Sequence, residues 1–152
     1  MSGTAFGGSV TRVTTTQELP LGFQVTVPNG DAGDQVWIYV SASESLVVGS
    51  VCSLAAAATT YNVRKIPVDT HACTVVGVAQ HVIAGSSYGF ILRRGKGVVL
   101  ADSGGVTVNL GMIAGDAVGT ADAAAAVTDA SFGVAQATAA SATAACWLNC
   151  PG

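Results

Sequence analysis

Short stretches of alternating or densely apolar residues recur along this chain. Residues 23–27 alternate between large apolar and polar side chains, the period-two pattern of a strand with one buried face. Residues 36–40 (VWIYV) and 74–79 (TVVGVA) are dense in β-branched and aromatic residues, which is typical of buried strands. The Pro-Asn-Gly sequence at 28–30 marks a turn between the first two of these strands.

The pattern continues to the C-terminus. Residues 88–92 and 97–100 predict strand on either side of Arg93-Arg94-Gly95-Lys96, which is either a hairpin connection or a bulge. Four later stretches also predict strands: 106–110, 117–119, 132–135 and 145–148. Many short strands at regular spacing indicate an all-β fold, either a small compact β-barrel or a β-sandwich, of which a jelly-roll is one variant.

Two alanine-rich runs, 121–126 and 137–145, compete with this interpretation because alanine is the best helix former. Both runs contain Thr or Asp, however, and neither has large apolar residues at helical spacing. We therefore predict extended structure in both.

A weak internal repeat supports a fold made of two similar β units. Gly77-Val78-Ala79-Gln80 recurs as Gly133-Val134-Ala135-Gln136, and a gapless extension aligns residues 90–92 with residues 146–148. Residues 49–51 have a looser counterpart in residues 115–118. Two copies are too few for a solenoid, so both units should belong to one domain.

The chain of 152 residues has the length of one domain. Residues 1–18 are rich in Gly, Ser and Thr and predict an extended N-terminal arm, which leaves residues 19–152 as a single β domain.

The low content of charged residues predicts that part of the protein surface is covered. Only 10% of the residues are charged and 50% are hydrophobic, so much of the surface should be hidden against copies of the chain or against a partner. The alternative is a monomer with an uncharged polar surface. The net charge of −3 argues against nucleic-acid binding. No apolar run is long enough to span a membrane, and the N-terminal residues do not resemble an export signal, so we expect synthesis in a cytoplasm.

Catalytic chemistry is not indicated by any motif. His71 and His81 lack a recognisable second catalytic group, and the aspartates occur at turn-like positions without metal-binding spacing. We therefore predict a non-enzymatic protein with no catalytic residues, no metal and no cofactor. The four cysteines, Cys52, Cys73, Cys146 and Cys150, are expected to be buried thiols, although a Cys52–Cys73 bridge remains open.

Five of the six basic residues form two groups, Arg64-Lys65 and Arg93, Arg94 and Lys96, with Arg12 in the arm as the sixth. They either keep two surface regions soluble or dock against an acidic partner.

The order of several short motifs resembles the decoration (cement) proteins of tailed-bacteriophage capsids. These motifs are Leu19-Pro20-Leu21-Gly22, Trp37-Ile38-Tyr39-Val40-Ser41-Ala42, Gly49-x-Val51, Val76-Gly77-Val78-Ala79-Gln80, Gly115-Asp116-Ala117-Val118 and Gly133-Val134-Ala135. Members of that family are small β-rich proteins, often homotrimers, that bind between capsomers and stabilise the expanded shell.

The resemblance implies a location on the capsid exterior of a virion and the major capsid protein as partner. The family has no catalytic residues to transfer. We hypothesise that the arm and six basic residues include the capsid contacts: Arg12, Arg64, Lys65, Arg93, Arg94 and Lys96.

Two other classes remain. One is a phage fibre, adhesion or carbohydrate-binding module, whose aromatic platform would come from Trp37, Tyr88 and Trp147. The other is an enzyme assembled from scattered Asp and His residues.

Overall fold

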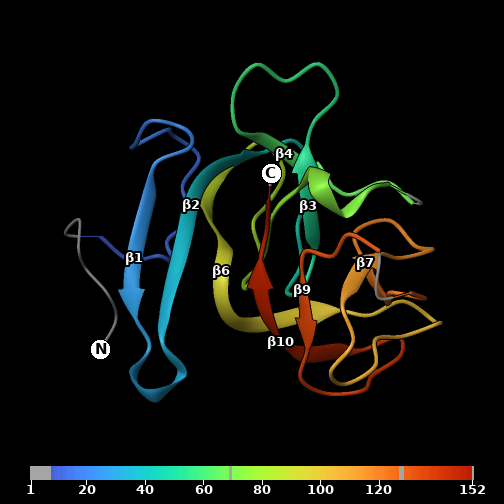
Figure 1. Cartoon of the computed structure of the whole chain (residues 1–152). Helices are drawn as coiled ribbons and strands as arrows, with labels where there is room; N and C mark the ends of the chain where they lie inside the picture. The colour runs from blue at the N-terminus through green and yellow to red at the C-terminus, as the bar shows by residue number, and fades with distance from the viewer. Residues whose placement is uncertain (1–7, 69, 127–128, 152) are drawn as a thin grey trace.

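The computed structural model describes residues 8–68, 70–126 and 129–151, and it is nearly all β, with 44% strand and 4% helix (Figure 1). This confirms the predicted fold class. The helical residues lie in two 3-10 turns, η1 (Gly30–Ala32) and η2 (Ala72–Thr74). The strands are β1 (Gln24–Pro28), β2 (Asp34–Ala42), β3 (Val51–Leu54), β4 (Asn62–Lys65), β5 (Val75–Val78), β6 (Tyr88–Leu100), β7 (Met112–Ala114), β8 (Ala121–Ala123), β9 (Gly133–Ala135) and β10 (Thr143–Asn149). No helix in these ranges is long and apolar enough to cross a membrane.

Five strands close into a barrel in the order β2-β4-β3-β5-β6, with β6 pairing back onto β2. The β2–β4 pair is parallel and the other pairs are antiparallel. Strand β1 adds to β2 outside this ring. We call residues 34–94, which form the barrel, the first unit.

Both faces of the barrel wall are buried. Along β2, Ile38 and Val40 point into the barrel, where they meet a compact set of medium-sized side chains. Trp37 and Tyr39 point outward into a second apolar layer, which β1 and the C-terminal strands share. Because apolar residues serve both faces, the strands read as continuous apolar runs in the sequence.

Strand β6 is 13 residues long and runs through the region that the sequence left open as a hairpin or a bulge. Val36 lies opposite Arg94 whereas Trp37 lies opposite Leu92, so Arg93 is the extra residue of a bulge. The bulge prediction is confirmed and the hairpin alternative is wrong. Gly95, at φ +109°, passes so close to β2 that a Cβ there would lie 2.8 Å from the Asp34 carbonyl oxygen.

Beyond this bend, the extra strands repeat the barrel's order of pairing. The C-terminal part of β6 pairs with β10, and β10 pairs with β9. A bridge between Gly111 and Val134 joins β9 to the start of β7, which pairs with β8. A parallel bridge between Ala101 and Ala121 connects β8 back to the end of β6. We call residues 95–151 the second unit; its β6 segment, β7, β8, β9 and β10 correspond to β2, β3, β4, β5 and β6.

Backbone hydrogen bonds match between the units. Leu46 and Ile83 exchange N–H and carbonyl bonds in the first unit, as Val106 and Ala139 do in the second. Residues with a positive φ also recur at equivalent places. Gly49 in the first unit corresponds to Asn109 in the second, and Ser86 corresponds to Ser141. The predicted pair of similar β units is therefore confirmed.

The register of the repeat differs from the gapless sequence alignment. In the first unit Trp37 pairs with Leu92, and in the second unit the equivalent pair is Lys96 with Trp147. The counterpart of Leu92 is therefore Trp147, whereas the gapless alignment matched it to Leu148. The looser match of residues 49–51 to 115–118 is also wrong, because Gly49 corresponds to Asn109.

Two predicted strands are absent from the described structure. Residues 106–110 form one bridge at Val106 followed by a turn through Asn109 at φ +67°. Residues 117–119 lie in the turn between β7 and β8. Of the alternating apolar residues at 106–110 only Val106 is buried, while Val108 and Leu110 are exposed, and in both places a tight turn uses the residues that the sequence assigned to a strand.

The alanine-rich runs form strand only at residues 121–123 and 143–145, and the rest of each run lies in loops and bends apart from a bridge at Ala139. The second unit packs small walls around a few large side chains. Interior positions held by Ile38, Val63 and Ile83 in the first unit are held by glycine or alanine in the second, at residues 97, 121 and 139. Phe132 and Met112, both fully buried, fill the space.

Residues 8–18 of the predicted arm lie against the first unit. Thr14 and Tyr88 exchange backbone hydrogen bonds of 3.0 and 2.8 Å, and the Glu18 N–H donates to the Tyr39 hydroxyl. Residues 1–7 lie outside the described ranges, so the arm boundary at residue 18 stays a prediction.

Gly97 is where the two units interlock. A Cβ at this position would lie 2.5 Å from Leu92 Cδ2 and 2.8 Å from Gln80 Oε1. The Gln80 amide in turn bonds both backbone groups of Val98 at 2.9 Å. Leu92 of the first unit thus occupies the space that a side chain at Gly97 would take in the second.

We expect Gly97→Ala to lower stability by about 1–3 kcal/mol, because Leu92 and Gln80 must move to admit the methyl group. The matched control is Gly85→Ala, where the nearest atoms lie 3.4 Å from the new Cβ. Chemical denaturation measures both, and equal stability of the two variants would contradict the interlock.

Candidate functional site

The bulge and bend in β6 place three basic residues, Arg93, Arg94 and Lys96, where the two units meet. We call this set the basic junction. Arg94 and Lys96 are exposed, whereas Arg93 is half-buried. None of the three forms an ion pair with a described residue, so their charges are available to an acidic partner.

A groove of about 400 Å³ lies beside the basic junction. Arg93 and Arg94 line it together with Gln24 and Val36 on one side and the C-terminal segment 149–151 on the other. Arg94 Nε donates to Asn149 Oδ1 at 3.3 Å, and the Cys150 N–H donates to the Arg93 carbonyl at 3.0 Å. These bonds connect β6 to the C-terminal segment at the groove.

Lys96 extends the basic junction onto an exposed aromatic residue. It pairs with Trp147 across the β6–β10 ladder, and Trp147 is 39% exposed. Gln35 Nε2 donates to the Lys96 carbonyl at 2.7 Å, and the Lys96 residue is exposed. Tryptophan is enriched in protein interfaces, so Trp147 is a candidate contact residue next to the basic junction.

The other predicted contact residues lie elsewhere. Arg64 and Lys65 are on β4, which is separated from β6 by β2 in the barrel. Arg64 lines an opening of about 440 Å³ at the end of the barrel, and its Nε is buried without a hydrogen-bond partner. Arg12 forms an exposed ion pair with Glu18. The structure thus places the basic junction beside the exposed Trp147. The second basic group, Arg64 and Lys65, lies apart from it.

The aromatic platform of a carbohydrate-binding module is not assembled. Trp37 is only 5% exposed. Tyr88 is half-buried and stacks on Tyr39 with ring centroids 6.4 Å apart. Of the three proposed platform residues, only Trp147 offers a ring to solvent.

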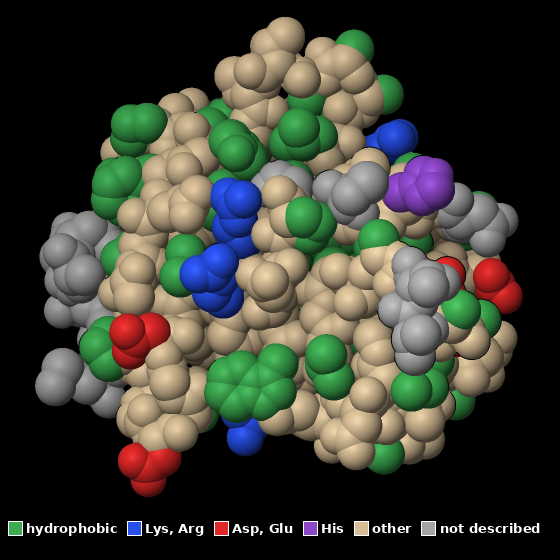
Figure 2. Space-filling model, viewed as in Figure 1, with side chains coloured by type: hydrophobic (Ala, Val, Ile, Leu, Met, Phe, Trp, Pro, Cys, Tyr) green, Lys and Arg blue, Asp and Glu red, His purple; other side chains and the backbone are tan. Residues whose placement is uncertain are grey.

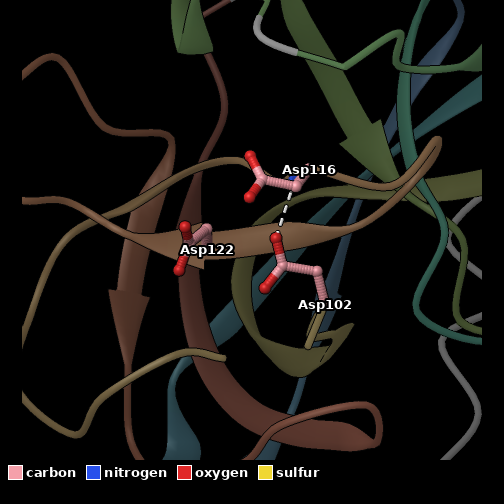
Figure 3. A group of neighbouring side chains, drawn as sticks. All are labelled: Asp102, Asp116 and Asp122. Carbon is pink, nitrogen blue, oxygen red and sulfur yellow. Dashed lines mark hydrogen bonds between the residues drawn. The ribbon is translucent and has the colours of Figure 1, made fainter. Parts of the chain in front are cut away.

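Three carboxylates that the sequence did not connect meet in the second unit: Asp102, Asp116 and Asp122 (Figure 3). One oxygen from each lies within 4.8 Å of the others. Such oxygens could in principle bind a hard cation. Asp102, however, is 3% exposed and already accepts the N–H groups of Gly105 at 2.8 Å and Asp116 at 2.7 Å. Its role is therefore to hold two turns together.

Burial and the two neighbouring carboxylates raise the pKa of Asp122, while a hydrogen bond from the Ala123 N–H opposes the shift. The signal for Asp102 was present in the sequence, since Asp-Ser-Gly-Gly at 102–105 is a turn pattern. Its two partners lie too far along the chain to be assigned from spacing.

Three of the four thiols, Cys52, Cys146 and Cys150, are buried, as predicted. Burial raises the pKa of Cys52 and of Cys146 to about 12 and raises the pKa of Cys150 as well, so these groups stay protonated and unreactive at neutral pH. Cys52 is a free thiol, so the Cys52–Cys73 bridge is wrong. The side chain of Cys73 lies outside the described part.

The two histidines differ. His71 is exposed, whereas both ring nitrogens of His81 are buried without a hydrogen-bond partner. Burial lowers the pKa of His81. No carboxylate is positioned to orient either ring among the described hydrogen bonds and ion pairs.

On the face shown in Figure 2, charged side chains are few and apolar side chains are spread between uncharged polar ones. Among the described residues, eleven large apolar ones are exposed: Val13, Val47, Val48, Leu54, Val68, Val82, Val108, Leu110, Val118, Val134 and Trp147. Apolar residues scattered singly are common on protein surfaces, so these positions do not by themselves mark a contact site.

Comparison with known proteins identifies the fold. No family model matches the sequence, and the search of curated proteins finds no match. Among solved structures, the chain is similar to the head fiber gp8.5 N base in bacteriophage phi29, with a TM-score of 0.55 and 14% sequence identity. The similarity covers 76% of this chain and 94% of the other. At this identity the likeness shows a shared fold.

We expect Asp122→Asn to raise the melting temperature at pH 7, because it removes one charge from the carboxylate group while keeping the acceptor for the Ala123 N–H. A raised pKa means that the folded state favours the protonated Asp122. The advantage of the variant should therefore shrink as the pH falls and the wild-type carboxyl takes up its proton. A lower melting temperature at pH 7 would contradict this.

We expect stability to fall as the pH drops below 6.5, the ordinary pKa of histidine. The unfolded chain then protonates His81 while the folded state resists, because its lowered pKa favours the neutral ring. His81→Phe should remove this part of the pH dependence, whereas His71→Gln should retain it. Thermal unfolding between pH 5 and 8 makes the comparison, and identical profiles for all three proteins would refute the assignment.

Proposed function

We propose that this protein is a structural, non-catalytic component of a tailed-phage virion that binds the outside of the head. The observation that carries the proposal is the fold shared with the base of a phage head fiber over 94% of that chain. The sequence motifs independently resemble capsid decoration proteins. Two separate lines of similarity thus favour the same location.

The physical properties suit such a role. A protein that binds only the assembled shell stabilises it by mass action, because its binding free energy is lost when the shell comes apart. A stiff, doubly packed β body with few charges and several exposed apolar residues provides binding surface without reactive groups. The unpaired charges of the basic junction would increase the rate and specificity of docking on an acidic capsid surface.

Within this role we favour a decoration protein that sits between capsomers in contact with the major capsid protein, as a homotrimer. The second candidate is the base of a head fibre, which the fold likeness favours directly. Both would bind the head, but they differ in number and projection. A decoration protein occupies many equivalent sites on the shell, whereas a fibre base occupies sites from which a further segment extends.

The test uses expanded capsids of the phage that encodes this chain, purified from a strain in which its gene is deleted. We expect added protein to co-sediment with the capsids and to raise their melting temperature. Occupancy counted by cryo-electron microscopy separates the two candidates. Absence of binding to expanded capsids, with the protein folded, would refute both.

We expect Arg94→Gln/Lys96→Gln to weaken capsid binding at physiological salt by about tenfold, because two positive charges without an ion-pair partner in the described structure no longer face the acidic surface. The matched control is Val82→Glu/Val118→Glu, which changes the net charge by the same amount at two exposed sites. Co-sedimentation at several salt concentrations measures the effect. Equal loss in both double variants would show that net charge matters and that the basic junction does not.

A further inference from the structure

The internal repeat reveals a surface that is covered in one unit and open in the other. On the outside of the first unit, four apolar side chains are fully buried: Val51, Ile66, Val75 and Val78. Their counterparts in the second unit are Gly111, Ala124, Ser131 and Val134, of which Ser131 and Val134 are exposed. The same outer face is therefore used as a packing surface once and left uncovered once.

The covered face is occupied by the turn between β7 and β8, residues 115–120. The Val51 N–H donates to the Gly119 carbonyl at 2.9 Å, and the Gly119 N–H donates to the Ile66 carbonyl at 2.9 Å. The Lys65 stem closes over Gly119, where a Cβ would lie 3.0 Å from it. A turn from one unit thus fits between β3 and the chain after β4 of the other.

In the second unit the equivalent position is a groove of about 350 Å³. The Ala124 N–H donates to the Gly111 carbonyl at 2.9 Å, as the Ile66 N–H does to the Val51 carbonyl at 2.8 Å, so the local geometry is the same. The Gly111 N–H and the Ala124 carbonyl, which would bind an inserted turn, have no partner among the described residues. Leu110 and Val134, at the groove, are each 42% exposed.

We propose that this groove binds the β3–β4 loop, residues 55–61, of a second copy of the chain. This loop is the first unit's counterpart of the turn that fills the covered face. A hydrogen bond of 2.8 Å from the Ala55 N–H to the Asn62 carbonyl closes the loop. In the turn, the Gly115 N–H donates to the Thr120 carbonyl at 2.9 Å in the same way.

The loop has the shape and composition that the groove requires. It stands out from the body at the top of Figure 1, between β3 and β4. Its sequence, AAAATTY, has no charged residue, and its tip at residues 56–57 is exposed. Small side chains permit the close backbone approach that the two unpaired groups of Gly111 and Ala124 need.

A loop-to-groove contact is heterologous, because each copy contributes a different surface. Such contacts produce a ring when the rotation between copies closes and a chain when it does not. A closed ring of three copies would agree with the homotrimer proposed above. The contact itself rests on the repeat within the chain and does not depend on any role in a virion.

Sedimentation velocity of the purified protein over a concentration series tests the proposal. We expect wild-type protein to self-associate, and we expect Ala56→Arg in the loop or Val134→Arg in the groove to weaken association about tenfold or more. Mixing the two variants should restore one contact, because Ala56→Arg keeps an intact groove and Val134→Arg keeps an intact loop. The mixture should form a one-to-one dimer and nothing larger.

The control is Val82→Arg, an exposed apolar residue outside both surfaces, which should associate like wild type. Circular dichroism verifies that each variant is folded. Wild-type protein that stays monomeric at every concentration would overturn the proposal. So would association that survives both single substitutions, or a mixture of the two variants that remains monomeric.

Discussion

The structure depends on the packing of Leu92 against Gly97 within a single bent strand. Leu92 points outward from the first unit, and Gly97 leaves the space that this side chain occupies in the second. The bulge at Arg93 and the turn of the backbone at Gly95 make the contact possible by redirecting β6. One strand therefore contributes to both units, and neither unit can be repacked without disturbing the other.

The same arrangement determines which surfaces remain for partners. Because the second unit covers the outer face of the first, the first presents its β3–β4 loop and its arm. The second presents its groove and the strand that carries Trp147. The basic junction lies at the bend in β6 between the two units, where the bulge leaves the side chains of Arg94 and Lys96 exposed. In the proposed role, a shared strand would position the surfaces that contact partners.

The sequence predicted the fold class, several strands and the presence of two similar units, because β-branched residues and period-two alternation depend on local packing. It did not predict the turn at Asn109, since Val106, Val108 and Leu110 alternate as a strand would. It misaligned the last strand by one residue, because a single deletion after Ala139 leaves no mark in an alanine-rich run. Asp102 and the partnership of Lys96 with Trp147 depend on pairings between distant segments, which spacing does not reveal.

The most direct test of the proposed role is a cryo-electron microscopy reconstruction of the virion of the phage that encodes this chain. The account predicts density for the two-unit body on the outside of the head, with the basic junction facing the shell. A virion without this chain, or one that carries it only in the tail, would contradict it.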